Sequence, residues 1–384
     1  MKRNTIRVVG GVALSLTLAA AMTACGTAKP GAEGGGACKG KIGFFGALSG
    51  GNASVVLPSR DGAKLAFKQF KAKNKDCDVK LVEFDTEGDP AKASPVASKI
   101  ASDQTFIGTI GGAFSGETRA TKKTFDEAGV TMVSASATAT DLTAQDPAKV
   151  FHRVVGHDEF QGTAIGKYVV NVLKAKKAFV VDDGTTYGKP LADKVVETAG
   201  SAVVSRDHVQ EKQTDFASTV AKVKNANADA VFYAGYANEA GPFLKQLRAA
   251  GIKVPFVGGD GLYGSDFPAA AGSQAEGAIV TCPCLPAEKA KGSFAADFKA
   301  EYGEDPGAYA AEGYDAANVF LDAIKAGNTT RAKVQEYVNK YDKEGVTKRI
   351  KFDSKGDVAE SNVVIWAYKI KGGKLVPDQE ISLK

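Results

Sequence analysis

The sequence has few of the residues on which most enzyme chemistry depends. Its 384 residues include only three histidines, His152, His157 and His208, and none of them stands at metal-ligand spacing from a cysteine or a carboxylate. The hydrolase motifs G-x-S-x-G, S-x-x-K and H-E-x-x-H are absent, as is the phosphate-binding motif G-x-x-x-x-G-K-[ST]. We therefore predict no enzyme activity, no metal site and no cofactor.

After its first residues, the chain has no apolar run long enough to span a bilayer. Residues 8–21 are apolar or small, follow a positively charged start, and have the length of a signal-peptide core. The next four residues, MTAC, resemble the lipobox of bacterial lipoproteins. This resemblance implies that residues 1–24 are cleaved as a signal peptide and that Cys25 carries a lipid. An ordinary signal peptide with a chance cysteine is the alternative.

The glycine-rich residues that follow Cys25 have no apolar periodicity. Such a composition is typical of a flexible linker, which we place at residues 25–38. We expect an exported protein that is lipid-anchored on the outer face of the cytoplasmic membrane or in the periplasm.

The charge of the chain gives no support to a nucleic-acid partner. The full sequence has 49 basic and 44 acidic residues, a formal net charge of +5. Three of the basic residues precede residue 24, which leaves 46 basic against 44 acidic residues and a net of +2 after cleavage. A nearly neutral chain without blocks of like charge lacks the electrostatic footprint of a DNA- or RNA-binding protein.

Four cysteines remain if Cys25 is lipidated, and an even number in an exported protein favours disulfides. Cys38 precedes the first strand-like segment and Cys77 precedes the second. Neighbouring parallel strands would bring these two starts together, so we predict a disulfide between them. Cys282 and Cys284 either close a tight local ring over one proline or stay reduced, and we expect the ring.

Strand-like and helix-like segments alternate from residue 41 onward. The strand-like segments are 41–46, 79–84, 106–110, 130–134, 178–181, 202–209, 230–234 and 255–258. The helix-like segments are 58–74, 90–103, 116–128, 160–173, 188–199, 216–225 and 239–250. This alternation predicts an α/β protein with two Rossmann-like lobes, each a parallel sheet flanked by helices.

Ligands of such sheets bind beyond the carboxyl ends of the strands. The loops at these positions are small, hydroxylated and rich in glycine, and helices start directly after several of them. Free N–H groups at a helix start, together with hydroxyls, form a ready anion site. The pair Asp182-Asp183 suits either a metal or acid–base site or a polar loop in which one carboxylate caps the next helix, and we favour the loop.

Several segments in order resemble one known family. They are KIGFFGALSG at 41–50, SASATATDLT at 134–143, Tyr187-Gly188, and a segment that ends in LKQLRAAG at residue 251. In this spacing they are similar to the branched-chain amino-acid substrate-binding proteins of ABC importers, which are type I periplasmic binding proteins. The similarity runs from about residue 41 to residue 369.

The resemblance implies two lobes with a ligand cleft between them and a three-strand hinge. We expect lobe 1 at residues 39–156 plus 284–360 and lobe 2 at residues 157–283 plus 361–384. The chain would then cross between the lobes three times, and the lobes would close by bending at these crossings.

The resemblance also implies how an amino acid is held. Ser115 and Thr138 match the residues that bind the α-carboxylate, and Ser136 matches the residue whose backbone carbonyl accepts from the ammonium. Tyr236 and Asp260 match the ammonium partners in the second lobe. The family usually has Glu where this chain has Asp260, so the reach is one methylene shorter here.

The remaining ligand residues would shape the side-chain pocket. Tyr187 matches a wall residue, Tyr309 matches an aromatic position over the pocket, and Ala137 belongs to the same loop as the carboxylate site. Phe114 stands where close relatives have a small residue and would narrow or reshape the apolar pocket. Val55 or a neighbour replaces the family's aromatic residue on the first loop.

We therefore predict an extracytoplasmic solute receptor that binds an apolar, branched-chain L-amino acid and delivers it to an ABC transporter permease. We expect it to act as a monomer, tied to the membrane by its lipid anchor. The same fold binding another small amino acid, an amide or a urea-like solute is the nearest alternative. An anchored hydrolase and a sensor are the alternatives from other classes.

Overall fold

The computed structural model describes residues 38–144 and 149–383. The predicted signal peptide, Cys25 and most of the linker lie outside these residues. In the described part of the chain, no helix is both long enough and apolar enough to cross a bilayer.

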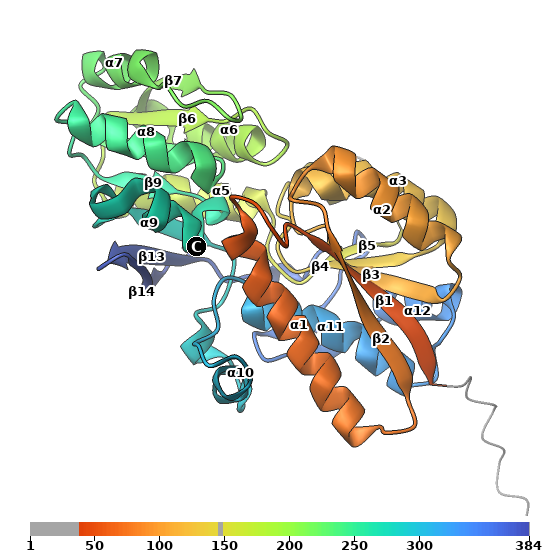
Figure 1. Ribbon diagram of the computed structural model, residues 1–384. Coiled ribbons are helices and arrows are strands. Elements are labelled where there is room, and N and C mark those ends of the chain that lie inside the picture. The colour runs from red at the N-terminus through yellow and green to blue at the C-terminus, as the bar shows by residue number, and fades with distance from the viewer. Residues whose placement is uncertain (1–37, 145–148, 384) are drawn as a thin grey trace, which may run out of the picture. The chain divides into compact units, whose positions relative to one another are not determined.

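A five-stranded sheet organises the first lobe (Figure 1). Its strand order is β2-β1-β3-β4-β5 and all neighbours are parallel. The strands are β1 (Lys39–Gly46), β2 (Asp78–Asp85), β3 (Phe106–Ile110), β4 (Thr131–Ser134) and β5 (Phe151–Arg153). The helices are α1 (Ala53–Lys73), α2 (Pro90–Ser102), α3 (Ser115–Ala128), α4 (Asp141–Ala144), α11 (Ala310–Lys325) and α12 (Arg331–Asn339). We call this sheet and these helices the first lobe.

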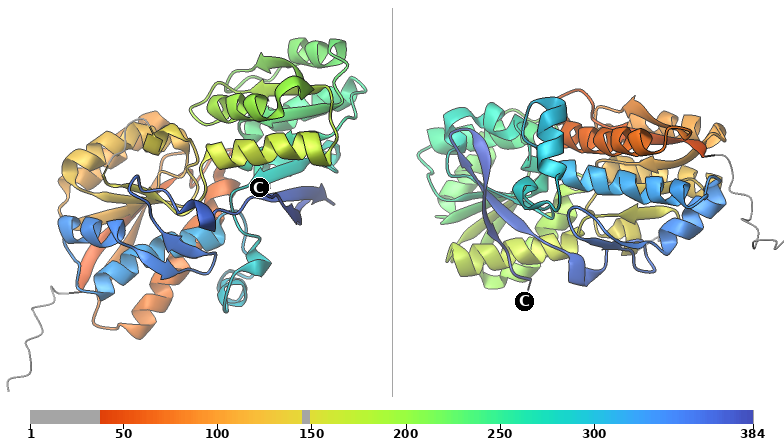
Figure 2. Two further views of the ribbon diagram at one scale, coloured as in Figure 1. Left: turned by 180° about the vertical axis from the view of Figure 1, so that it is seen from behind. Right: turned by 90° about the horizontal axis from the view of Figure 1, so that it is seen from below.

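Helices cover both faces of the first sheet. The helices α1 and α11 lie side by side over one face, where α12 also packs, and α2 and α3 cover the other (Figures 1 and 2). The central strands β3 and β4 are buried along their whole length, as parallel strands between two helical layers must be. A small hairpin, β11 (Asp342–Glu344) and β12 (Arg349–Lys351), follows α12.

A seven-stranded sheet organises the second lobe, in the order β14-β13-β10-β9-β8-β6-β7. The strands are β6 (Ala178–Asp182), β7 (Val203–His208), β8 (Ala230–Ala234), β9 (Phe256–Gly258), β10 (Ile279–Cys282), β13 (Trp366–Lys371) and β14 (Lys374–Glu380). The helices are α5 (Asp158–Lys167), which continues as a π-helical turn at Tyr168–Val172, α6 (Gly188–Ala199), α7 (Ala217–Asn225), α8 (Ala237–Ala249) and α9 (Asp266–Ala271). We call this sheet and these helices the second lobe. The helix α10 (Phe294–Tyr302) follows β10 and contacts α1.

The fold class is the predicted one, but the second sheet is mixed rather than wholly parallel. The strand β13 runs antiparallel to β10 and forms a hairpin with β14 (Figure 2). Gly372 and Gly373, at φ 56° and φ 75°, make the two-residue turn between these strands. Such a turn joins only antiparallel neighbours and favours residues that tolerate positive φ. The predicted alternation stops at residue 258 and so misses this hairpin.

The first helix starts earlier than its proline predicts. The sequence places the start at Pro58, but α1 begins at Ala53 and contains Pro58 in its second turn. The amide of Ser54 donates to Asp266 Oδ2 at 3.0 Å, and the amide of Asp266 donates to Ser54 Oγ at 3.0 Å. Each of these two amides, at the starts of α1 and α9, is therefore capped by the side chain of the other residue across the lobes. Sequence periodicity does not reveal such a contact.

The first predicted disulfide is confirmed. Cys38 and Cys77 are bonded, directly before a register pair formed by Lys39 of β1 and Asp78 of β2. The amide of Asp78 also donates to the carbonyl of Cys38 at 2.8 Å. The cross-link therefore joins the starts of two adjacent strands at one end of the first sheet.

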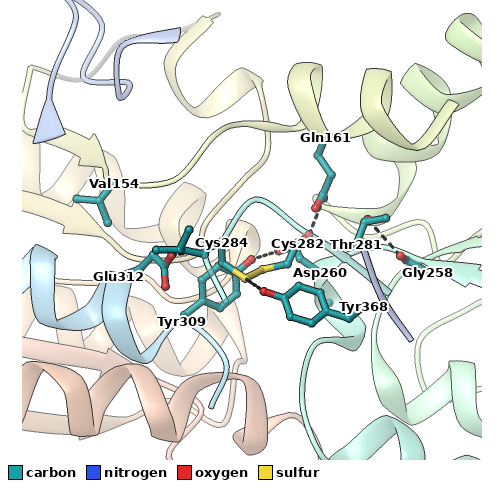
Figure 3. The surroundings of a disulfide bond; sticks show 12 residues. Val154, Gln161, Gly258, Asp260, Thr281, Cys282, Cys284, Tyr309, Glu312 and Tyr368 are labelled. Atoms are coloured by element: carbon teal, nitrogen blue, oxygen red, sulfur yellow. Dashed lines mark hydrogen bonds between the residues drawn. A yellow bond between two sulfur atoms is a disulfide. The ribbon is translucent and has the colours of Figure 1, made fainter. Parts of the chain in front are cut away.

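The second predicted disulfide is also present and lies where the chain leaves the second sheet. Cys282 ends β10, and its bond to Cys284 closes a ring over Pro283 (Figure 3). Both cysteines are fully buried. Cys284 Sγ lies 3.8 Å from the hydroxyl of Tyr368 on β13, so the ring packs against the second sheet.

Removing the first disulfide should destabilise the protein strongly. It closes a loop between residues 39 positions apart, and in the chain-entropy model losing it costs roughly 3–4 kcal/mol of unfolding free energy. The double variant Cys38→Ser/Cys77→Ser tests this by urea denaturation. The matched double variant Cys282→Ser/Cys284→Ser opens a far shorter loop and should cost much less. A free thiol at Cys77 in non-reduced peptide mapping of the parent would contradict the assignment.

Candidate functional site

The loops at the carboxyl ends of strands from both sheets line one pocket. Its lining consists of Val55, Ala113, Phe114, Ser115, Ser136, Thr138, Tyr187, Tyr236, Asp260, Gly261 and Tyr309. The first lobe contributes the loops after β3 and β4 and the starts of α1 and α11. The second lobe contributes the loops after β6, β8 and β9. The structure thus brings together every predicted ligand residue except Ala137.

Ala137 lies in the hydrophobic core beneath the pocket rather than in its wall. It is fully buried, in a cluster with residues of β4 and β5. Its amide donates to Ser134 Oγ at 2.9 Å, and its carbonyl accepts from Arg153 Nη1 at 3.1 Å. Both of its backbone polar groups therefore hold the loop in place.

The first-lobe side of the pocket is rich in hydrogen-bond donors. Ser115 is the first residue of α3, a 14-residue helix whose amino end carries a partial positive charge. Ser115 Oγ accepts from the amide of Ala139 at 3.1 Å, and Ser136 Oγ donates to the carbonyl of Ala113 at 2.7 Å. The Thr138 amide has no acceptor among the described residues. This side suits an anion.

A buried acid holds the start of α3. Glu117 is fully buried and accepts from the amide of Phe114 at 3.1 Å and from the hydroxyl of Thr86. Burial raises the pKa of Glu117 to about 7, and the two hydrogen bonds oppose this rise. Glu117 does not line the pocket, so we regard it as a support for the loop that carries Ser115.

Asp260 is the acceptor on the second-lobe side (Figure 3). It is 5% exposed and receives three hydrogen bonds, of which Figure 3 shows those from Gln161 and Tyr309. Its Oδ1 accepts from Gln161 Nε2 at 2.6 Å and from the Tyr187 hydroxyl at 2.7 Å, and its Oδ2 accepts from the Tyr309 hydroxyl at 2.5 Å. Burial raises the pKa of Asp260, and these donors lower it. Since Oδ2 takes only one of these bonds, it keeps a lone pair for a further donor.

Two residues of this site are missed by the sequence. Asp158 and Gln161 lie on α5, and Gln161 Nε2 donates to Asp158 Oδ1 at 3.2 Å as well as to Asp260. Asp158 is 1% exposed, and its Oδ2 has no hydrogen-bond partner among the described residues. Burial, followed by the charge of Asp260, raises the pKa of Asp158 well above its usual value, and hydrogen bonding from the side chains of Thr138 and Gln161 opposes this rise. No motif surrounds these residues, so only the fold reveals them.

Three aromatic rings separate the pocket from a larger hollow outside it. Phe114, Tyr187 and Tyr236 line both spaces. Phe114 meets Tyr236 edge to face, with ring centroids 5.2 Å apart, and Tyr187 lies 5.3 Å from Tyr236. Phe114 comes from the first lobe and the two tyrosines come from the second, so these contacts join the lobes. The rings offer an apolar wall to a ligand.

Tyr309 contributes more than an aromatic cover. It precedes α11 with φ 54°, a left-handed conformation that is uncommon for a residue with a side chain. Its ring is buried, and its hydroxyl reaches Asp260 from the first lobe. The strained backbone is thus associated with a hydrogen bond between the lobes.

The other candidates of the sequence lie away from the pocket. Asp183 Oδ1 accepts from the amide and hydroxyl of Thr185, and Thr185 Oγ1 accepts from the amide of Gly188 at the start of α6. The capping role favoured for this loop therefore falls to Thr185, which Asp183 holds. None of the three histidines lines the pocket. In the described residues, no group of three or more His, Cys, Asp or Glu side chains could hold a metal ion.

These features define a class: two-lobed α/β binding proteins whose ligand site lies between strand-end loops of two sheets. Residues 39–374 match the family model described as periplasmic binding protein. The chain belongs to this family.

Relatives of this chain are named as amino-acid-binding proteins. A Leu/Ile/Val-binding protein of Citrobacter freundii is 32% identical over 330 residues, which cover 83% of this chain and 88% of the relative. A leucine-, isoleucine-, valine-, threonine- and alanine-binding protein of Pseudomonas aeruginosa is 30% identical, covering 85% and 89%. The branched-chain amino acid transporter substrate-binding protein LivJ of Streptococcus pneumoniae, solved with isoleucine, superposes with a TM-score of 0.82 at 28% identity and covers 89% of this chain and 98% of its own.

Removing the Thr138 hydroxyl should weaken ligand binding while the fold survives. Its backbone carbonyl, which accepts from the amide of Asp158 at 2.8 Å, is kept in Thr138→Val. A lost hydrogen bond to a buried charged group costs roughly 1–3 kcal/mol, so affinity for the tightest amino acid should fall about fivefold or more. Calorimetry with leucine, checked by an unchanged melting temperature of the ligand-free protein, measures this. Parent-like binding by Thr138→Val would remove Thr138 from the anion site.

Proposed function

We propose that this protein is an extracytoplasmic receptor for an apolar, branched-chain L-amino acid, which it delivers to the permease of an ABC transporter. The observation that carries the proposal is the polarity of the pocket. Donors gather on the first-lobe side, around Ser115 and Thr138, and the buried carboxylate of Asp260 lies on the second-lobe side. An amino acid has a carboxylate, which suits the donors, and an ammonium, which suits Asp260, and both groups are attached to the same carbon atom.

The walls of the pocket support an apolar ligand side chain. The lining also includes Val55, Ala113, Phe114 and the rings of the three tyrosines. The names of the characterised relatives, which report binding of leucine, isoleucine and valine, agree with such a pocket. An amide or a urea-like solute has no ammonium and would leave Asp260 as a buried charge without a cation, which is costly.

The receptor would work by closing its two lobes on the ligand. We place lobe 1 at residues 39–156 plus 284–360 and lobe 2 at residues 157–283 plus 361–384, and closure would bend the three crossings between them. A ligand that bridges both lobes would stabilise their contact. The receptor acts as a monomer without catalysis, and a lipid on Cys25 ties it to the membrane.

Neutralising Asp260 should remove most of the affinity for amino acids. Asp260→Asn keeps the size of the side chain but leaves a ligand ammonium without its counter-charge in a desolvated pocket. Truncating one member of a buried charge pair costs about 2–5 kcal/mol, so affinity should fall by roughly thirtyfold or more. Calorimetry with leucine on the parent and the variant measures the change.

A ligand without its ammonium provides the control. The des-amino analogue of leucine, a plain branched carboxylic acid, should bind the parent poorly. The preference for leucine over this analogue should shrink in Asp260→Asn. If the parent binds both compounds equally well, Asp260 does not recognise an ammonium and the amino-acid assignment is wrong.

Shortening Phe114 should relax the choice of ligand side chain. Because this ring separates the pocket from the outer hollow, Phe114→Ala should give a long or aromatic side chain more room. Differences of one to a few methylenes in such a pocket are worth about 1–3 kcal/mol, so the ratio of affinities for phenylalanine over valine should rise roughly tenfold or more. A competition thermal-shift series measures the ratio. An unchanged ratio would show that Phe114 does not limit ligand size.

A further inference from the structure

Two buried carboxyl groups share one amide donor beside the pocket. Gln161 Nε2 lies 2.6 Å from Asp260 Oδ1 and 3.2 Å from Asp158 Oδ1. Both carboxyl groups therefore lie within hydrogen-bond reach of one nitrogen atom. Asp158 is 1% exposed and Asp260 is 5% exposed. Two like charges held this close, away from water, repel each other strongly.

The cation whose charge acts on this pair is committed elsewhere. The charge of Arg153 lowers the pKa of Asp158, but Arg153 is fully buried and bonded to other groups. Its Nε donates to Asp357 at 2.5 Å, its Nη1 to the carbonyls of Ala137 and Ala139, and its Nη2 to Thr143 at 2.8 Å. The pair thus keeps an excess of negative charge when both acids are ionised.

The pair also has more acceptors than donors. Asp158 Oδ2 and Gln161 Oε1 are buried without a hydrogen-bond partner among the described residues, and Asp260 Oδ2 has a spare lone pair. A buried acceptor without a donor is unfavourable. A proton on one of the two acids would supply a donor and remove the repulsion, and an ammonium group, with three N–H donors and a positive charge, would do the same.

We propose that Asp158 and Asp260 share a single proton before ligand binds, and that the ammonium of an incoming amino acid displaces it. Gln161 is the positioning residue that holds the two carboxyl groups together. On binding, the O–H bond of the shared acid breaks, its electron pair stays on the carboxylate, and the proton passes to buffer. The inference rests on the proposed function because it requires a ligand that carries an ammonium.

The groups around the pair do not supply an alternative source of this proton at neutral pH. The other charged groups that act on the pair or on the nearby tyrosines Tyr187, Tyr236 and Tyr309 are Arg153, Glu117, Glu312 and Asp183, and His157 directly precedes Asp158 in the chain. Burial lowers the pKa of His157 to about 4, so it is neutral, and burial raises the pKa values of the three tyrosines well above their usual value, so they stay protonated. Burial raises the pKa of Glu117 and of Asp183 to about 7, and it also raises the pKa of Glu312.

The sign of the pH dependence follows from the displacement. Burial and mutual repulsion raise the pKa of the ligand-free pair, and a bound ammonium lowers it. Below the ligand-free pKa, binding must expel a proton, so affinity increases by up to tenfold for each unit by which the pH is raised. Above that pKa the pair is already ionised, and affinity is independent of pH for as long as the amino group of the ligand stays protonated.

Calorimetry counts the protons directly. Leucine, or the amino acid that most raises the melting temperature, is titrated into the full protein at one pH in two buffers with different ionisation enthalpies. For the parent, the binding enthalpies observed in the two buffers should differ at low pH by an amount that corresponds to close to one released proton. At high pH the two enthalpies should be the same. Asp158→Asn should release none at either pH and should lose the pH dependence of affinity.

The role of Gln161 has its own readout. Gln161→Met keeps the length of the side chain and removes the amide donor that stabilises the ionised pair. The proton released should remain close to one, while the midpoint of the affinity profile should move to higher pH. A purely structural role would lower affinity at every pH and leave the midpoint where it is.

A matched variant separates this pair from other buried acids. Asp183→Asn removes a buried carboxyl group whose pKa is raised to about 7 but that does not line the pocket. It should release protons as the parent does. If the parent binds leucine with no proton release, or takes a proton up, the inference is wrong while the proposed function stands. If no amino acid binds, both are wrong.

Discussion

The carboxylate of Asp260 is the interaction around which the site is built. It comes from the second lobe, yet it collects hydrogen bonds from Tyr187 and Gln161 of the same lobe and from Tyr309 of the first. Each donor lowers the cost of keeping a charge out of water. Because one of the donors belongs to the other lobe, the solvation of this charge depends on how the lobes meet. The charge state of Asp260 and the contact between the lobes therefore depend on each other.

Other contacts between the lobes have the same character. Ser54 and Asp266 cap each other's helix starts, each donating its amide to the other's side chain at 3.0 Å. Phe114 packs edge to face on Tyr236 at 5.2 Å. These contacts are directional, and they are accompanied by an apolar cluster that includes Tyr309 of the first lobe and Trp366 and Tyr368 of the second. Each lobe otherwise has a buried sheet between helical layers at its centre.

The sequence predicts the parts of this protein that are set locally and misses those set by tertiary contact. The strand-end loops with Ser115, Thr138 and Asp260 follow from alternating periodicity together with a family resemblance, and the Cys38–Cys77 bond follows from strand order. The early start of α1 depends on Asp266, more than two hundred residues away, so no local signal predicts it. Asp158 and Gln161 look like ordinary residues at a helix start. Their role depends on where α5 lies relative to the loop after β9.

The same comparison explains why the missed residues matter to the chemistry. A family pattern identifies groups that touch a ligand, because these groups are tied to recognisable loops. It says little about the charges behind them, which decide whether a carboxylate is ionised when the ligand arrives. In this chain the supporting charges are unbalanced: Arg153 is committed to Asp357 and to backbone carbonyls, while Asp158 is left with an oxygen that has no partner among the described residues. A pocket with such an imbalance favours a cationic group more strongly than its lining alone suggests, since the cation relieves a cost that the folded chain already carries.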